Sequence, residues 1–308
     1  MNIEVFPTMI TPFLANGQVD YVGVEKLTEF YWKKGCDGIF AVCQSSEMFF
    51  LTQEERYKIA KTVVNKANNL AKTDDSRPRM KIVVSGHVAN DFDEQVEELS
   101  LMAKTNADAL ILLTNKFDIE NTSEQKWIAD LNRLIEKLPN VPLGLYECPK
   151  PYKRLLTSTM LEEIKQLKRF KFIKDTCCDA AMIGDRVKSL SGSGIMLYNA
   201  NAQTLLESTS AGASGYCGVM ANFHPDIIKK VFEIAPECRE ILQAYVCLSA
   251  FTESLCYPAN AKYYLSEFEG IEIGLSSRAV DCSGVTDYVK SVLAQMKTLG
   301  DYLLLKLI

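Results

Sequence analysis

Short apolar runs alternate with longer amphipathic segments from the start of the chain to about residue 235. The short runs have the length and composition of buried strands, and between them apolar residues recur at spacings of three and four, as on a packed helix. We expect eight strands, at 4–10, 38–42, 81–85, 109–113, 143–146, 171–174, 195–198 and 213–217. Capping residues predict where helices begin: Asp20, Thr52 followed by Glu55, and Asp91 followed by Glu94.

Eight such strand–helix units can build an open doubly wound sheet or a closed barrel. The glycine fingerprint of dinucleotide-binding folds, G-x-G-x-x-G, follows none of the expected strands. The repeated unit therefore favours a (β/α)8 TIM barrel of the α/β class. After about Pro236 the strand signals disappear and helical stretches at 240–254 and 285–305 dominate. We divide the chain into a barrel catalytic domain, 1–234, and a C-terminal helical layer packed on the barrel, 235–308.

Composition and charge narrow the class of protein. The 308 residues are 47% hydrophobic and carry a net charge of −5, which argues against a nucleic-acid partner. No apolar stretch is long enough for a membrane span, and the first residues lack the features of a signal peptide. Ten cysteines without a C-x-x-C pair indicate free thiols in a reducing compartment, and two distant histidines argue against a metal site. We expect a cytoplasmic protein.

The candidate catalytic residues lie where the expected strands end, because (β/α)8 barrels hold their active sites at that face. Lys174 closes the apolar run of the sixth strand, where partial desolvation would favour the neutral, nucleophilic amine. Tyr146 closes the fifth strand and can relay a proton to a substrate oxygen. Each residue also has a structural alternative: a lysine that extends to solvent, and a tyrosine at the edge of the core.

Three further elements complete the candidate site. Gln44 and Ser45 lie in a tight turn after the second strand, where backbone N–H groups and a hydroxyl can hold a carboxylate. His87 follows the third strand and would face the barrel mouth as an acid or base, unless it is a hydrogen-bonded structural histidine. Small residues at 212–218 bracket the eighth strand; they can admit a ligand or serve packing.

Together these stretches resemble the dihydrodipicolinate synthase / N-acetylneuraminate lyase family of class I pyruvate-dependent aldolases. Six segments in the right order and spacing carry the resemblance. They are Thr11-Pro12-Phe13, Cys43 to Glu47 followed by Leu51-Thr52-x-x-Glu55, Leu145 to Pro149, Ile173 to Thr176, Gly212 to Asn222, and Tyr257 to Lys262.

The resemblance implies roles for these residues. Lys174 would form an imine with pyruvate or another 2-oxo acid, and Tyr146 would relay protons to the aldehyde partner. Gln44 and Ser45 would hold the pyruvate carboxylate, and Cys217 occupies the apolar position beside the imine. The imine is the electron sink, so no cofactor and no metal is required. The family also implies a homo-oligomer, a tetramer or a dimer.

Departures from the family pattern argue against true dihydrodipicolinate synthesis. Gln44 and Glu147 replace a threonine and an asparagine, and Pro151 stands where an arginine holds the second substrate; Lys150, Lys153 and Arg154 are the nearest bases. The tyrosine after the fourth strand is also missing, with residues 115–117 in its place. We expect an aldolase or lyase acting on pyruvate and a small polar aldehyde. The alternatives are a 2-keto-3-deoxy sugar acid dehydratase that uses the same imine and a non-catalytic relative that binds a 2-oxo acid.

Overall fold

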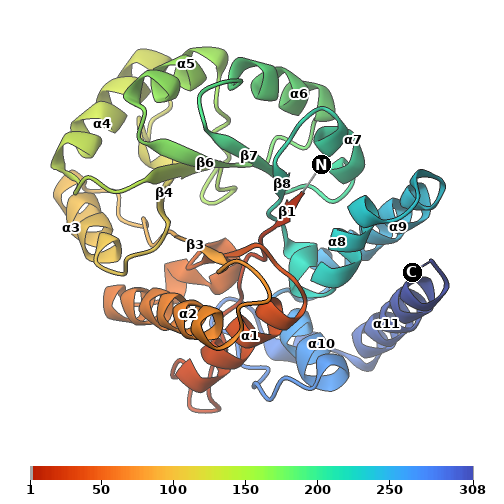
Figure 1. The fold of residues 1–308 in the computed structure, drawn as a ribbon. Coiled ribbons are helices and arrows are strands. Elements are labelled where there is room, and N and C mark those ends of the chain that lie inside the picture. Colours follow the sequence, from red (N-terminus) through yellow and green to blue (C-terminus); the bar gives the residue numbers. More distant parts are fainter. Residues whose placement is uncertain (1–2, 308) are drawn as a thin grey trace.

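Eight parallel strands curve into a nearly closed barrel surrounded by helices in the computed structural model, which describes residues 3–307 (Figure 1). The strands are β1 Glu4–Val5, β2 Gly38–Ala41, β3 Lys81–Val84, β4 Ala109–Leu113, β5 Leu143–Tyr146, β6 Phe170–Asp175, β7 Met196–Asn199 and β8 Gly215–Tyr216. Hydrogen bonds run in the order β1-β8-β7-β6-β5-β4-β3-β2. Phe40 closes the ring, since its backbone N–H donates to Pro7 and its carbonyl accepts from Met9, both at 3.0 Å. The predicted (β/α)8 barrel is confirmed and the doubly wound alternative is wrong.

Helices follow the strands as the pattern predicts. They are α1 Tyr21–Lys33, α2 Gln53–Thr73, α3 Phe92–Ala103, α4 Glu124–Lys137, α5 Ser158–Leu167, α6 Ala180–Ser189, α7 Leu205–Ser210 and α8 Pro225–Glu233. The predicted caps are present: Asp20 accepts from the first turn of α1, and Thr52 and Glu55 form a reciprocal capping box at the start of α2. Asp91 accepts two backbone N–H groups at the start of α3.

The first strand is shorter than predicted, and the reason is local. The expected run, 4–10, contains Pro7, which has no N–H to donate to a neighbouring strand. The regular ladder with β8 therefore ends at Val5, and Thr8 bridges to Phe40 of β2 instead.

An aromatic layer fills the barrel beneath the strand ends. Phe172 stacks on Tyr198 with ring centroids 4.4 Å apart, and Phe6 packs against both of these rings. Phe40 contacts Phe172 on one side and Tyr146 on the other. This packed layer forms a rigid floor for whatever lies at the carboxyl ends of the strands.

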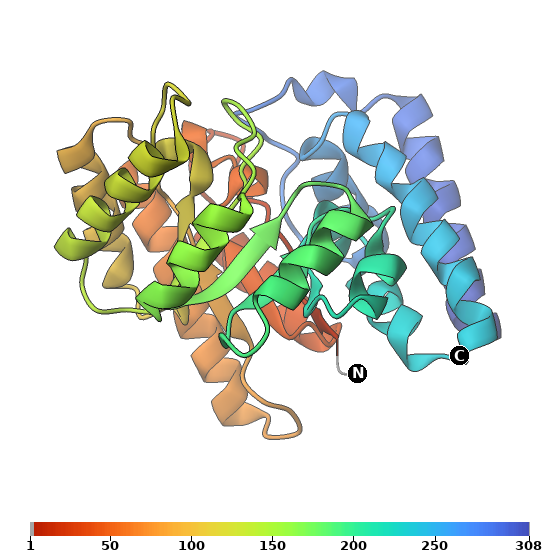
Figure 2. The same ribbon diagram turned by 90° about the horizontal axis from the view of Figure 1, so that it is seen from above.

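The chain after the eighth helix forms a helical layer beside the barrel (Figures 1 and 2). It contains α9 Pro236–Ser249, the short 3₁₀ helix η5 Ala250–Ser254, α10 Ala259–Glu269 and α11 Asp287–Leu307. Helices α9 and α11 lie side by side, and Tyr245 of α9 donates to the carbonyl of Met296 at 2.8 Å (Figure 2). Helix α10 was not predicted, because buried polar residues such as Asn260 and Lys262 interrupt its apolar pattern.

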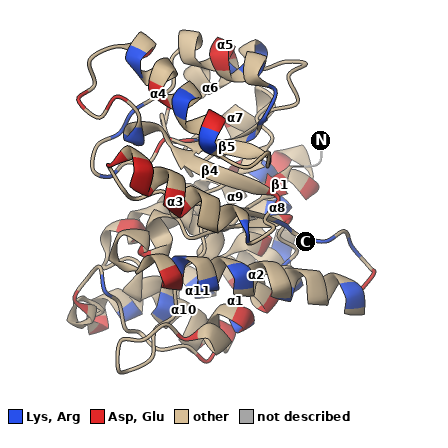
Figure 3. Cartoon of the chain, turned by 90° about the vertical axis from the view of Figure 1, so that its left-hand side faces the viewer, with Lys and Arg blue, Asp and Glu red and all other residues tan. Residues whose placement is uncertain are grey.

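Surface charge is mixed. Figure 3 shows Lys and Arg interspersed with Asp and Glu along the helices of one side of the molecule. Within residues 3–307, no helix combines the length and the apolar character that crossing a membrane requires.

Candidate active site

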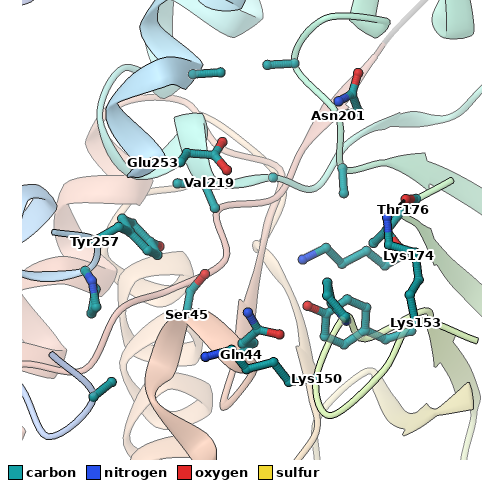
Figure 4. Close-up of a pocket in the computed structure, with 18 of the residues that line it drawn as sticks. Gln44, Ser45, Lys150, Lys153, Lys174, Thr176, Asn201, Val219, Glu253 and Tyr257 are labelled. Carbon is teal, nitrogen blue, oxygen red and sulfur yellow. Dashed lines mark hydrogen bonds between the residues drawn. The ribbon is translucent and has the colours of Figure 1, made fainter. Parts of the chain in front are cut away.

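A cavity of about 550 Å³ opens at the carboxyl ends of the strands (Figure 4). Residues that follow β2, β5, β6, β7 and β8 line it, and the helical layer adds η5 and the segment around Val280. This is the face at which (β/α)8 barrels hold their active sites.

Lys174 projects into this cavity (Figure 4). Phe172 packs inward against the aromatic layer, and since side chains alternate along a strand, Lys174 two residues later shares that face. Its side chain is only 5% exposed, and its Nζ lies 4.3 Å from the ring centroid of Tyr146 and 5.6 Å from that of Phe40. Within residues 3–307 the amine has no ion-pair or hydrogen-bond partner. Packing against these rings therefore holds it in place.

Tyr146 is the cross-strand neighbour of Lys174. The register of β5 and β6 pairs these two residues directly. Burial raises the pKa of the Tyr146 hydroxyl well above its ordinary value. The phenol consequently stays protonated and can donate to an oxygen bound near Lys174.

The turn after β2, where the sequence predicts a carboxylate-binding site, borders the cavity. Gln44 and Ser45 begin the 3₁₀ turn η1 Gln44–Ser46, so their backbone N–H groups have no acceptor within the turn. The Ser45 hydroxyl donates to Thr8 at 3.1 Å, and the side-chain oxygen of Gln44 accepts from the thiol of Cys148 at 3.5 Å. Both Gln44 and Ser45 line the cavity, as a carboxylate-binding turn requires.

Cys217 is fully buried directly after β8 and is not among the residues that line the cavity. Burial raises the pKa of its thiol to about 12, and Lys174 is close enough to oppose this shift. Cys217 is therefore a neutral, apolar neighbour of the lysine.

The structure does not bring His87 into the cavity. Its ring is buried against Phe117, its Nε2 lies 2.7 Å from the side-chain oxygen of Gln95, and its Nδ1 accepts from the backbone N–H of Leu113 at 3.1 Å. The proton is therefore on Nε2. Burial lowers the pKa of His87 to about 3, so the ring is neutral. These contacts match the structural alternative stated for this residue, a hydrogen-bonded histidine, and do not place it over a substrate.

The sequence did not predict a buried ion-pair network beside the ends of β5 and β6. Glu147 and Asp175 immediately follow Tyr146 and Lys174, and the guanidinium group of Arg186 on α6 binds both carboxylates. Arg186 is 3.0 Å from Glu147 and forms a short hydrogen bond with Asp175. The signal was an acidic residue directly after each of two neighbouring strand ends.

A second buried ion pair ties the helical layer to the turn after β2. Glu47, the residue after η1, accepts from Lys262 of α10 at 2.7 Å. Its other oxygen accepts from the hydroxyl of Ser277 and from the backbone N–H groups of Arg278 and Ala279. Glu47 thereby fixes the segment that carries Ala279 along the wall of the cavity.

Within the part of the chain that the structure describes, no three His, Cys, Asp or Glu side chains are grouped to hold a metal ion. All ten cysteines are free thiols. Three lysines and two tyrosines line the cavity: Lys150, Lys153, Lys174, Tyr146 and Tyr257.

A model of the dihydrodipicolinate synthetase family matches residues 2–241, which is most of the chain. The chain belongs to this family. Its members are class I carbon–carbon lyases.

Named relatives are distant. The 4-hydroxy-tetrahydrodipicolinate synthase of Clostridium perfringens is 26% identical over 268 residues, covering 84% of this chain and 87% of that protein. The enzyme of the same name from Methanococcus aeolicus is 27% identical over 237 residues, with 76% and 75% covered.

Solved structures agree on the fold. A dihydrodipicolinate synthase from Acinetobacter baumannii in complex with pyruvate superposes with a TM-score of 0.81 at 20% identity, over 98% of this chain and 99% of that chain. YagE from E. coli K12, a prophage protein of the dihydrodipicolinic acid synthase family in complex with pyruvate, gives 0.80 at 18% identity, with 98% of each chain covered.

Asn115, in the segment where the sequence lacks the tyrosine after the fourth strand, has a structural role. Asn115 turns its amide toward the loop after β5, where it donates to the carbonyls of Cys148, Lys150 and Tyr152. The fourth-strand region therefore supports this loop instead of presenting a phenol.

Of the three bases near position 151, two line the cavity. Lys150 is exposed at its rim, and Lys153 donates to the backbone carbonyl of Thr176 at 2.7 Å (Figure 4). Arg154 is buried elsewhere, beside Asp118. Of the three side chains, Lys150 alone lines the cavity without a hydrogen-bond partner within residues 3–307.

Two further cavity residues were missed. Tyr257 accepts a hydrogen bond from Asn222 at 3.0 Å, and Glu253 projects inward from η5 (Figure 4). Glu253 lies in a helical stretch without the strand-end signal that marked the other candidates, so the sequence pattern gave no reason to choose it.

Proposed function

We propose that this chain is a Schiff-base-forming, pyruvate-dependent aldolase or lyase that makes or cleaves a carbon–carbon bond between pyruvate and a small polar aldehyde. The observation that carries the proposal is the pairing of Lys174 with Tyr146 across β5 and β6. The lysine has no partner within residues 3–307, and its Nζ lies 4.3 Å from the centre of the tyrosine ring.

The chemistry follows from these two groups. The neutral amine of Lys174 attacks the ketone carbon of pyruvate, and loss of water gives the imine. Loss of a proton from the methyl carbon gives an enamine, whose carbon forms the new bond to the aldehyde carbon. Tyr146 donates a proton to the aldehyde oxygen, and water then hydrolyses the imine to release the product and restore the amine. Cleavage is the same sequence in reverse.

The carboxylate of pyruvate would bind in the turn formed by Gln44 and Ser45, since both residues line the cavity and their backbone N–H groups have no acceptor within the turn. Cys217 would lie beside the imine as an uncharged neighbour. The proposed chemistry needs no cofactor, because the imine itself withdraws electrons.

The proposal includes a second substrate other than that of dihydrodipicolinate synthases. Support comes from Pro151, which provides no guanidinium group, and from Asn115, which holds the loop after β5. The dehydratase alternative loses the feature that favoured it, because His87 does not line the cavity. A homo-oligomer in the cytoplasm is part of the proposal; exposed apolar side chains such as Leu248 and Phe251, 65% and 70% exposed, are consistent with subunit contacts.

The test is intact-protein mass spectrometry after incubation with pyruvate and borohydride. A stable adduct is expected on the native protein and on Lys171→Ala, which removes an exposed lysine from the same strand. The adduct should be absent from Lys174→Ala. No adduct on the native protein at saturating pyruvate would overturn the aldolase proposal and leave a non-catalytic binding role.

A further inference from the structure

A phenol from the helical layer reaches the turn that follows β2. Tyr257 lies between η5 and α10 and lines the cavity together with Ser45. Figure 4 shows its hydroxyl turned toward Ser45, while the amine of Lys174 extends toward the same space from the other side. A helical-layer side chain therefore borders the part of the cavity in which the 2-oxo acid would bind.

Asn222 fixes the Tyr257 hydroxyl in this place. The Asn222 amide nitrogen donates to the phenolic oxygen at 3.0 Å and to the backbone carbonyl of Thr8 at 2.9 Å. Its side-chain oxygen accepts from the hydroxyl of Tyr31 at 2.7 Å, so the amide is oriented with its N–H groups toward Tyr257. Because Asn222 is the donor of this bond, the phenol retains its own proton for an acceptor.

Two further hydroxyls lie beside the phenol. The Ser45 hydroxyl donates to that of Thr8 at 3.1 Å, and both hydroxyls oppose the rise in the pKa of Tyr257 that its burial causes. A hydroxyl is a neutral acceptor, whereas a carboxylate is charged and forms hydrogen bonds roughly twice as strong. A carboxylate that enters the turn would therefore be a better acceptor for the protons of Ser45 and Tyr257 than any hydroxyl of this cluster.

We infer that Tyr257 is a further substrate-binding residue, whose hydroxyl donates to the carboxylate of the 2-oxo acid held in the turn of Gln44 and Ser45. The inference rests on the proposed function and deepens it. The carboxylate is then bound jointly by the barrel and by the helical layer. Tyr257 favours a 2-oxo acid over a simple ketone, because a ketone without a carboxylate leaves the phenol unpaired.

The experiment compares pyruvate with acetone, in which a methyl group replaces the carboxylate. Both ketones are trapped on Lys174 with borohydride, and the second-order rate constant of trapping is measured by mass spectrometry. In Tyr257→Phe, which keeps the ring, the constant for pyruvate should fall by about tenfold or more, the usual effect of losing a hydrogen bond to a charged group. The constant for acetone should stay unchanged. Tyr288→Phe, which changes a phenol that is 70% exposed on α11 and does not line the cavity, is the matched control and should behave as the native protein does.

A double substitution separates a direct contact from an effect through Ser45. If the phenol touches the carboxylate itself, Tyr257→Phe should still lower the constant for pyruvate by about threefold or more when Ser45→Ala is also present. No further loss in the Ser45→Ala protein would overturn the inference, because Tyr257 would then act only by positioning Ser45.

Trapping on the native protein separates the two levels of the proposal. No adduct on the native protein would overturn the aldolase proposal and the inference together. With that adduct present, a Tyr257→Phe protein that traps pyruvate at the native rate would overturn the inference alone. Equal losses for pyruvate and acetone would also overturn it, because they would show that the phenol maintains the shape of the site and does not bind the carboxylate.

Discussion

Glu147 and Asp175 share one guanidinium group, that of Arg186, although they lie at the ends of different strands. Each carboxylate comes directly after a proposed catalytic residue, Tyr146 or Lys174. Arg186 also donates to the carbonyl of Leu156 at 2.6 Å. The ends of β5 and β6 are therefore tied together by a buried charge network, which keeps the lysine and the phenol in register.

Removing Arg186 should be costly. In Arg186→Met two buried carboxylates lose their cation, and we expect the free energy of unfolding to fall by about 3–5 kcal/mol. Denaturant unfolding at neutral pH measures this change. Lys188→Met removes an exposed cation from the same helix, where the lysine is 79% exposed, and should change stability by less than about 0.5 kcal/mol. Equal effects of the two substitutions would show that the network is not important for stability.

Glu147 should make the native protein less stable as pH rises. Burial and the neighbouring Asp175 raise the pKa of its carboxyl from 4.5 to about 7. A raised carboxyl pKa contributes stability that is fully present below about pH 4.5 and is lost as pH rises through about 7. Glu147→Gln lacks this titration, so its stability relative to the native protein should improve between pH 5 and pH 8. Urea unfolding at both pH values tests this, and a difference that does not change with pH would contradict it.

Tyr146 should matter for bond formation more than for imine formation. In Tyr146→Phe we expect the pyruvate adduct to form still, while the rate of carbon–carbon bond formation falls by about 10²–10⁴-fold, the usual range for a lost proton relay. Tyr152→Phe removes a hydroxyl that donates to the carbonyl of Ile119 outside the cavity, and serves as the control. A Tyr146→Phe protein with the native rate would remove the phenol from the mechanism.

His87 should affect stability at acid pH. Burial lowers its pKa from 6.5 to about 3, so its contribution is fully present above pH 6.5 and is lost as pH falls toward 3. At pH 5 the loss amounts to about 2 kcal/mol, and His224, whose pKa is lowered to about 4, acts in the same direction. His87→Gln should therefore lose less stability than the native protein between pH 7.5 and pH 5. If urea unfolding shows that the native protein and His87→Gln lose equal stability between pH 7.5 and pH 5, the His87 ring does not titrate in this range.

The sequence pattern was sufficient for the barrel, because buried parallel strands are continuous apolar runs and their helices keep a period of 3.6. The predictions were least accurate where the secondary structure depends on contacts with residues far away in the sequence. Pro7 ends the first ladder early, and α10 buries Lys262 only because Glu47, far away in the sequence, neutralises it. Such a partner cannot be read from local hydropathy.

In the candidate site, too, local sequence patterns predict some features, whereas others depend on residues that are distant in the sequence. Lys174, Tyr146, Gln44 and Ser45 were predicted because each closes or follows a strand, and the structure places all four on one cavity. His87 also follows a strand, yet its ring is held by Gln95 and Leu113. A strand-end position therefore predicts proximity to the barrel mouth but not the direction of the side chain, which depends on neighbouring hydrogen bonds.

Residues from two parts of the chain line the cavity. Lys174, Tyr146 and the turn of Gln44 and Ser45 belong to the barrel, whereas Glu253 and Ala279 come from the helical layer. Changes in the helical layer can thus alter which partner molecule is accepted while the covalent step stays the same. In the proposed reaction, substitutions confined to residues 250–280 would therefore change the wall that meets the second substrate and leave Lys174 and Tyr146 in place.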